Sequence, residues 1–200
     1  MTTLVGLLLA AGFSRRFGAD KLLRDISPTN CMAGQACKTL KENVDHAIAI
    51  VRPDQPALAT ILAESGAEIV VFEEAEKGMG ATLAFGVRSS AQADAWIVAL
   101  ADMPWIKSAT VRSVARSLKA GSPLVVPVHE HRRGHPVGFG SGFRDELCGL
   151  QGDQGARSIL SRHANQLLLL PCADPGIHRD VDTPADLDPI APSQLPDRRR

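Results

Sequence analysis

The stretch Leu4–Lys21, LVGLLLAAGFSRRFGADK, decides the fold, because a short apolar run passes directly into a loop rich in glycine and basic residues. The pattern predicts a buried strand followed by a tight loop. Gly12 and Gly18 permit the backbone angles and the close approach that let successive N–H groups point at one anion. Positive charge comes from Arg15, Arg16 and Lys21. A triphosphate carries roughly four negative charges and needs such cations, so the loop predicts a nucleoside triphosphate site.

Two better-known glycine loops do not fit this segment. A Walker loop has four residues between its glycines and Lys-Ser/Thr directly after the second, whereas here five residues separate Gly12 from Gly18, and Lys21 comes three residues later. The dinucleotide fingerprint G-x-G-x-x-G fails because Phe13 and Ser14 follow Gly12. The remaining alternative is an ordinary strand-to-helix turn with solvated arginines.

Six short motifs recur in one order along the chain. The pattern A-G-x-S-x-R-x-G-x-x-K is matched by Ala11, Gly12, Ser14, Arg16, Gly18 and Lys21. The others are G-M-G-x-T-L at Gly78–Leu83, A-D-M-P at Ala101–Pro104, G-H-P-V at Gly134–Val137, G-D-Q-G-A-R at Gly152–Arg157 and D-V-D-T-P-x-D at Asp180–Asp186. Together they resemble the molybdopterin cytidylyl- and guanylyltransferase group of nucleotidyltransferases, and more distantly the sugar-phosphate nucleotidyltransferases. The resemblance spans most of the chain; Ile26–Asn43 departs from the family pattern.

The resemblance implies a single-domain α/β fold, a three-layer sandwich around a mostly parallel, Rossmann-like sheet of the nucleotide-diphospho-sugar transferase type. A chain of 200 residues suits one such domain. We expect the domain to cover residues 1–188, and the proline-rich segment 189–200, which ends in three arginines, to be a disordered tail.

Charge and composition exclude several classes of protein. Lys plus Arg and Asp plus Glu both total 22, so the formal charge is zero, unlike the basic excess of a nonspecific nucleic-acid binder. Tyrosine is absent and aromatic residues make up 4%, which disfavours a base-stacking surface. No run reaches membrane-spanning length, and no basic residue precedes the apolar Leu4–Ala11, which disfavours a signal peptide. We expect a cytosolic protein that binds neither nucleic acid nor membrane.

The cysteines show no metal-binding spacing. Cys31, Cys37, Cys148 and Cys172 form no C-x-x-C pair. We therefore expect four reduced thiols.

Apolar runs of strand length alternate with helical patterns. The expected strands are Leu4–Leu9, Ala47–Val51, Glu68–Phe72, Trp96–Leu100, Leu124–Pro127, Leu167–Leu170 and Ile177–Val181. One helical face is expected around Leu58–Leu62 and another around Val111–Leu118, the second capped by Ser108 or Thr110. This alternation predicts a mostly parallel sheet covered on both faces, with ligands bound beyond the carboxyl ends of its strands.

Asp102 follows the apolar run Trp96–Ala101, which places a carboxylate at the exit of a buried strand. Mg²⁺ binds through one or two carboxylates together with substrate phosphates, so Asp102 is a candidate metal ligand. The alternative is a turn aspartate before Met103-Pro104.

The motif around Asp182 has two readings. Thr183 can cap a helix that begins at Pro184, with Asp186 completing a pair that resembles a capping box. That scheme does not need Asp182, and in similar enzymes the equivalent position completes the metal site. Asp182 is therefore the expected second metal ligand, with Asp180 in reserve.

The segment Gly78–Thr82 opens a predicted helix. Gly78 and Gly80 flank Met79 and let the backbone approach a flat ligand, while Thr82 offers a hydroxyl. By resemblance the segment contacts the base and ribose. The alternative is a turn before an amphipathic helix.

His129, His131 and His135 lie close in sequence but lack the cysteine or acidic partners of a zinc site. By resemblance, the acceptor of the transferred group is bound here, with Arg133, His135 and Arg157 as the candidate residues.

The resemblance implies a Mg²⁺-dependent transfer of a nucleoside monophosphate from a nucleoside triphosphate to a phosphorylated acceptor, which is molybdopterin, with the recipient molybdoenzyme as a further partner. Lys21, Arg16 and Asp102 are the expected catalytic residues. The nucleotide would bind along Leu9, Ala10, Ala11, Gly12, Ser14, Arg16, Gly18, Lys21, Gly78, Met79, Gly80, Thr82 and Asp102. The sequence L-A-A-G at Leu9–Gly12 is similar to the cytidine-using branch, so CTP is favoured over GTP. The alternatives are a sugar- or polyol-phosphate nucleotidyltransferase and a noncatalytic nucleotide-binding chaperone.

Overall fold

A central sheet dominates the computed structural model, which describes residues 2–13, 21–183 and 186. The expected tail at 189–200 lies outside these residues. The strand order is β10-β7-β9-β6-β1-β4-β5, with β8 paired to β7. The strands are β1 (Leu4–Leu9), β4 (His46–Val51), β5 (Glu68–Val71), β6 (Ala95–Leu100), β7 (Leu124–His129), β8 (Arg132–Arg133), β9 (Val137–Gly140) and β10 (Leu167–Pro171). A separate hairpin consists of β2 (Asp25–Ser27) and β3 (Asn30–Cys31).

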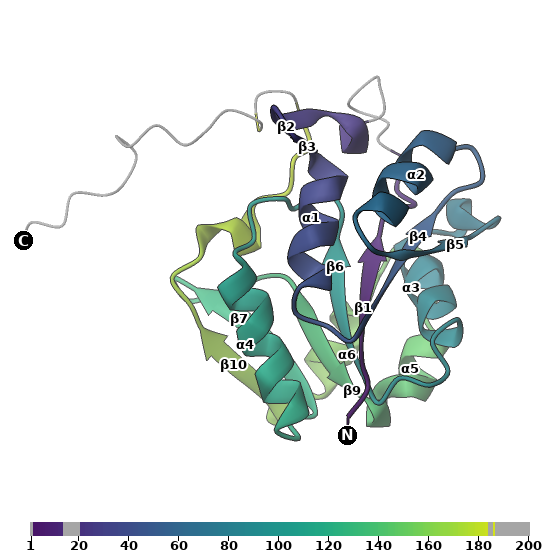
Figure 1. The fold of residues 1–200 in the computed structure, drawn as a ribbon. Coiled ribbons are helices and arrows are strands. Elements are labelled where there is room, and N and C mark those ends of the chain that lie inside the picture. The colour runs from purple at the N-terminus through teal and green to yellow at the C-terminus, as the bar shows by residue number, and fades with distance from the viewer. Residues whose placement is uncertain (1, 14–20, 184–185, 187–200) are drawn as a thin grey trace, which may run out of the picture.

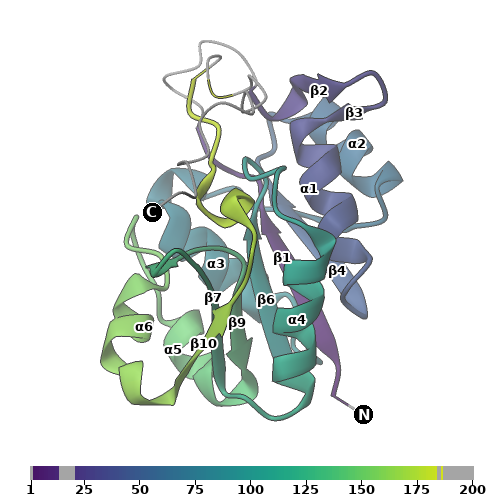
Figure 2. The same ribbon diagram turned by 90° about the vertical axis from the view of Figure 1, so that its left-hand side faces the viewer.

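The helices cover both faces of the sheet. They are α1 (Met32–Lys41), α2 (Pro56–Glu64), α3 (Met79–Arg88), α4 (Ser108–Lys119), α5 (Arg144–Cys148) and α6 (Arg157–Arg162). Short 3₁₀ helices are η1 (Lys21–Leu23), η2 (Ala75–Lys77), η3 (Ser141–Phe143), η4 (Ala164–Gln166) and η5 (Pro175–His178). Helices α1, α2 and α4 lie on one face, and α3, α5 and α6 lie on the other (Figures 1 and 2). The expected three-layer α/β fold is confirmed.

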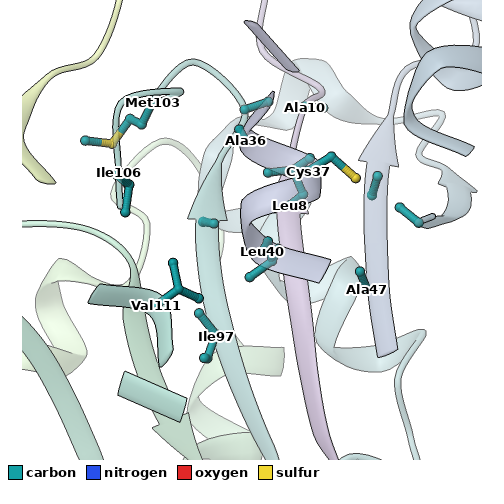
Figure 3. Packing of buried hydrophobic residues seen from close by; sticks show 14 of the residues in the cluster. Leu8, Ala10, Ala36, Cys37, Leu40, Ala47, Ile97, Met103, Ile106 and Val111 are labelled. Carbon is teal, nitrogen blue, oxygen red and sulfur yellow. The ribbon is translucent and has the colours of Figure 1, made fainter. Parts of the chain in front are cut away.

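Strand β1 lies in the interior of the sheet, between β4 and β6, and is parallel to both. Its side chains alternate between two cores: Leu4 and Leu8 pack toward α1 and α4, while Val5 and Leu7 pack toward α3. Figure 3 shows the first of these cores, to which Leu8 of β1 and both Cys37 and Leu40 of α1 belong. Because both faces are buried, the strand needs a continuous apolar run rather than an alternating one.

The observed strands differ from the predicted ones in several places, of which two bear on the site. Ile177–Val181 was expected to be a strand, but it begins in η5 and continues without strand structure. Its groups pair elsewhere, since Ile177 O accepts from His135 N at 3.0 Å and Val181 N donates to Asp102 O at 3.0 Å. Conversely, β9 was not expected, and it runs antiparallel between β6 and β7.

The cap of α4 also differs from the expectation. Neither Ser108 nor Thr110 is the N-cap residue; Lys107 holds that position and makes no side-chain cap bond. Buried Asp174 provides the acceptor instead, at 2.9 Å from Lys107 N and 2.6 Å from Thr110 Oγ1. A carboxylate 67 residues away therefore holds the N-terminal end of α4 in place of a local side-chain cap.

Within the described residues, no helix has the length and apolarity required to cross a membrane.

Candidate active site

The candidate site lies at the carboxyl edge of the parallel strands. Gly12 follows β1, Arg52 follows β4 and Asp102 follows β6. Two further bonds extend the pairing beyond the strands, from Ala10 N to Ile50 O at 3.0 Å and from Ala101 N to Leu9 O at 3.1 Å. The three segments therefore leave the sheet side by side, as expected for a ligand site in an open α/β sheet.

A cavity of about 310 Å³, here the small cavity, opens between the loop after β1 and the start of α3. Its walls include Leu9, Ala11, Gly12, Phe13, Gly78, Met79, Thr82 and Asp102. Most of the expected nucleotide-binding residues that the structure describes thus face one space. Ala10 does not line it, because its side chain is buried against the α1 face of the sheet (Figure 3).

The ammonium group of Lys21 joins two carboxylates at the edge of this cavity. Its Nζ lies 3.0 Å from Asp102 Oδ2, 3.4 Å from Asp182 Oδ1 and 2.7 Å from the carbonyl oxygen of Val181. The side chain of Lys21 is only 11% exposed, whereas the side chains of Asp102 and Asp182 are 25% and 49% exposed. The cation thus sits behind two carboxylates that remain open to solvent.

Asp186 organises the described part of the segment around Asp182, while the helix expected to begin at Pro184 lies outside the described residues. The Asp186 carboxylate accepts hydrogen bonds from Thr183 N at 2.7 Å, Thr183 Oγ1 at 2.9 Å and Asp182 N at 3.0 Å. These bonds, led by the one from the Thr183 hydroxyl, hold the pKa of Asp186 below its usual value. The Asp182 side chain meanwhile reaches Lys21, while Asp180 is exposed to solvent.

The glycines at the start of α3 accommodate a neighbouring loop of the chain. A Cβ on Gly80 would lie 2.8 Å from the carbonyl oxygens of Gln151 and Gly152, and Gly78 has a φ of +101°. Gly80 N donates to Gly152 O at 2.7 Å, and Met79 N donates to Asp153 Oδ1 at 3.3 Å. The close approach that the sequence suggested for a flat ligand is made here by the loop before α6.

A second cavity of about 700 Å³, here the large cavity, adjoins the first. The two share Leu9, Met79, Leu100 and Asp153 as walls. The expected acceptor residues Arg133, His135 and Arg157 all line the large cavity. They come from β8, the loop after it and the first residue of α6, so the structure brings together residues that are separated in sequence.

His135 combines a buried ring with an unused hydrogen-bonding atom. Among the described residues, its Nδ1 has no hydrogen-bond partner and no contact with solvent. Burial lowers the pKa of His135, although the charges of Asp102 and Asp180 oppose this effect. A neutral ring is therefore favoured, so His135 is not expected to bring a positive charge to the large cavity.

Three expected nucleotide-binding residues, Ser14, Arg16 and Gly18, lie outside the described residues, as does Arg15. Gly80 and Lys21 do not line the small cavity, since Gly80 faces the Gln151–Asp153 loop and Lys21 lies behind the carboxylates.

Comparison with known protein families identifies the family of this chain. Residues 6–167 match the model of the MobA-like NTP transferase domain. The chain belongs to that family. The resemblance to this group of nucleotidyltransferases is thereby confirmed, and the MobA-like chain is a nucleotidyltransferase.

Relatives match the MobA-like chain over nearly its whole length. Purine catabolism protein PucB of Bacillus subtilis (strain 168) is 31% identical over 94% of this chain and 95% of its own. Nicotine blue oxidoreductase of Paenarthrobacter nicotinovorans is 28% identical over 89% of this chain and 91% of its own. The crystal structure of Rv0371c from Mycobacterium tuberculosis H37Rv has a TM-score of 0.78 at 26% identity, over 92% of this chain and 95% of that one. A structure of Rv0371c in complex with manganese has a TM-score of 0.74 at 24% identity, with coverage of 92% and 96%.

Sequence reasoning missed two side chains that the MobA-like site contains. Asp153 lines both cavities, yet it was noted only as a letter of the motif G-D-Q-G-A-R. Arg52 contacts the loop after β1, and the only signal for it was a basic residue directly after a predicted strand. Arg52 bonds to a residue 40 positions away and Asp153 to one 74 positions away, and the local sequence around each predicts neither contact.

Proposed function

We propose that this nucleotidyltransferase moves a CMP group from CTP to the phosphate of molybdopterin, with Mg²⁺ as cofactor and pyrophosphate as the leaving group. One observation carries the proposal: Lys21, Asp102 and Asp182 converge beside a cavity whose walls include Gly12 and Phe13 of the loop after β1. An adjoining cavity with two arginines offers room for an anionic acceptor.

The donor atoms fit a divalent cation that prefers oxygen. Two carboxylate oxygens and the Val181 carbonyl oxygen already surround one positive charge, the ammonium of Lys21. Asp102 and Asp182 would hold Mg²⁺, which would neutralise phosphate charge and polarise the reacting phosphate. Among the described residues, no three His, Cys, Asp or Glu side chains form a metal-binding group. Substrate phosphates and waters would therefore complete the coordination, as is usual for Mg²⁺.

The two cavities adjoin, which supports a donor and an acceptor bound next to each other. The base and ribose would occupy the small cavity, and the acceptor would occupy the large one, with Arg133 and Arg157 pairing with its phosphate. An oxygen of that phosphate attacks the α-phosphorus of the nucleotide, and the bond to pyrophosphate breaks. The attacking phosphate is already ionised, so no general base is required. Alignment and charge neutralisation then supply the catalysis.

The walls of the large cavity favour an acceptor with a sizeable organic body. Val98, Val126, Phe139 and Leu160 provide apolar surface, while the basic groups come from Arg133 and Arg157. A polyol phosphate would leave this apolar surface uncovered, whereas molybdopterin joins a ring system to a phosphate. The recipient molybdoenzyme is the protein partner that this proposal implies.

Pyrophosphate release tests the proposal and separates it from its alternatives. The purified protein is assayed with each of CTP, GTP, ATP and UTP, in the presence of molybdopterin, a polyol phosphate or no acceptor. We expect release with CTP and molybdopterin. Release only with the polyol phosphate would identify the sugar-phosphate type of enzyme, and nucleotide binding without any release would indicate a noncatalytic chaperone.

A further inference from the structure

Arg52 connects the end of β4 to the loop after β1. Its Nη1 donates a hydrogen bond to the carbonyl oxygen of Gly12 at 2.5 Å. Its guanidinium carbon lies 4.4 Å from the centroid of the Phe13 ring. Gly12 and Phe13 both line the small cavity, and Arg52 itself does not. Arg52 thus contacts the loop without lining the cavity.

The arginine is itself held in place. Asp54 Oδ1 accepts from Arg52 Nε at 2.9 Å, and Gln55 Oε1 accepts from Arg52 N at 3.1 Å. The hydrogen bond from Arg52 is the main reason that the pKa of Asp54 lies below its usual value. The Arg52 side chain is 13% exposed, so most of it packs against the protein. Such anchoring fixes the direction in which Nη1 points.

The contact to Gly12 determines the orientation of a peptide plane. In a trans peptide the carbonyl and the following N–H point in opposite directions, so a fixed Gly12 carbonyl also fixes the N–H of Phe13. No described atom lies within 4 Å of the position that a Cβ on Gly12 would take, so side-chain packing does not fix the backbone at this residue. Glycine also rotates more freely than any other residue.

We infer that Arg52 is a positioning residue, which orients the Gly12–Phe13 peptide so that the Phe13 N–H faces the phosphates of the nucleotide. This inference rests on the proposed nucleotidyl transfer and deepens it. Preorganised amides lower the cost of binding an anion, because the loop need not be ordered when the nucleotide arrives. The effect of Arg52 should therefore appear in nucleotide affinity more than in turnover.

The test compares Arg52→Ala and Arg52→Lys with the wild-type enzyme. Titration calorimetry with CTP gives Kd, and pyrophosphate release gives kcat and KM. We expect Arg52→Ala to raise Kd and KM about tenfold, the size of a hydrogen bond from a charged group, and to change kcat less than about threefold. Lysine keeps the charge but lacks the planar fork that contacts Gly12 and Asp54 together, so Arg52→Lys should restore part of the affinity.

Arg144→Ala is the matched control. Arg144 Nη2 donates to the carbonyl oxygens of Ala91 and Ala93 at 2.9 and 2.8 Å, and its guanidinium lies 4.7 Å from the Trp96 ring centroid. Arg144 thus resembles Arg52 in bonding to backbone carbonyl oxygens and in lying over an aromatic ring, but it lines neither cavity and, among the described residues, does not contact the loop after β1. Arg144→Ala should lower Tm and leave Kd for CTP unchanged.

The outcomes separate this inference from the proposed function. A wild-type protein that neither binds nor turns over any nucleotide would overturn the proposed function. A wild-type enzyme that binds CTP while Arg52→Ala binds it equally well would overturn the role of Arg52. So would a loss of kcat at unchanged Kd, or a loss of affinity that Arg144→Ala reproduces. If Arg52→Ala does not fold, the Kd of Arg52→Lys for CTP tests the inference by itself. The inference requires that Kd to exceed the wild-type value, and an equal Kd would overturn the role of Arg52.

Discussion

The ammonium nitrogen of Lys21 lies 3.0 Å from Oδ2 of Asp102, although 81 residues separate the two in sequence. The same nitrogen reaches Asp182, a further 80 residues along the chain, at 3.4 Å. A lysine that neutralises two candidate metal ligands competes for them with any other cation. A phosphate that draws Lys21 away would make these ligands available to a metal, so this pairing can couple metal binding to nucleotide binding.

Replacing Lys21 tests this competition. In Lys21→Met the carboxylates lose their internal cation, so the nucleotide-free protein should bind Mn²⁺ about tenfold more tightly, equivalent to about 1.4 kcal/mol. Turnover should fall more than nucleotide affinity does, because an ammonium that stabilises developing charge acts in the transition state. Mn²⁺ titration followed by electron paramagnetic resonance measures the first effect, and steady-state kinetics measures the second. Unchanged Mn²⁺ affinity would refute the competition.

Asp102→Asn should remove metal binding while the fold survives. The amide has nearly the same shape as the carboxylate but lacks the charge that offsets Mg²⁺, so turnover should fall by orders of magnitude. Mn²⁺ titration and circular dichroism report metal binding and folding separately. Asp180→Asn is the control, because Asp180 is exposed and the structure pairs Asp182 with Lys21. Near-normal Mg²⁺-dependent activity in Asp102→Asn would contradict the assignment.

The methyl group of Ala11 is expected to influence which base is used. Ala11 is buried and lines the small cavity, where a Cβ narrows the space beside the ligand. A pyrimidine should therefore fit more easily than a purine, and Ala11→Gly should weaken the preference for CTP over GTP without abolishing activity. One methyl group is worth roughly 1–3 kcal/mol, or about 10- to 200-fold in specificity. The values of kcat/KM for CTP, GTP, ATP and UTP, determined for the wild type and for Ala11→Gly, measure this preference. A wild-type preference for GTP would overturn the choice of CTP.

Gly80→Ala should disturb the contact between α3 and the loop before α6. The new Cβ would lie 2.8 Å from two carbonyl oxygens of the backbone, which cannot move aside as a side chain can. We expect a loss of about 1–3 kcal/mol in the free energy of unfolding, and a Tm lower by about 2–4 °C per kcal/mol. Thermal unfolding measures the change. Gly142→Ala is the control, because no described atom lies within 4 Å of its Cβ position; equal effects of the two variants would contradict the steric argument.

Cys37 should resist alkylation in the folded protein. Burial raises the pKa of its thiol to about 11 from an ordinary value of 9.0, because the charged thiolate is disfavoured away from water. At pH 8 the thiolate fraction then falls about 100-fold, and the thiolate is the form that reacts. Mass spectrometry after iodoacetamide treatment should find Cys148, which is partly exposed, modified well before Cys37. Equal rates in the folded protein would contradict this, while denaturation should make the rates similar.

Much of the fold was predictable because a parallel strand that is buried on both faces consists of a continuous run of apolar residues. The runs at Leu4–Leu9 and Trp96–Leu100 appear as β1 and as the last five residues of β6. Strand β9 was missed, since V-G-F-G is short and contains two glycines. Its Gly138 is needed where α4 crosses, because a Cβ there would lie 2.9 Å from Val114 and Leu118. That requirement belongs to the packed helix and has no local signal.

The sequence by itself determined the family and most of the parallel strands of the sheet, because these depend on residues that are neighbours along the chain. Only the tertiary structure decided that Asp182 pairs with Lys21, that Arg52 contacts Gly12, and that the Gln151–Asp153 loop packs on Gly80. These contacts join segments 40 to 161 residues apart. Their geometry follows from strand order and helix packing, which bring together residues whose local sequence contains no information about one another.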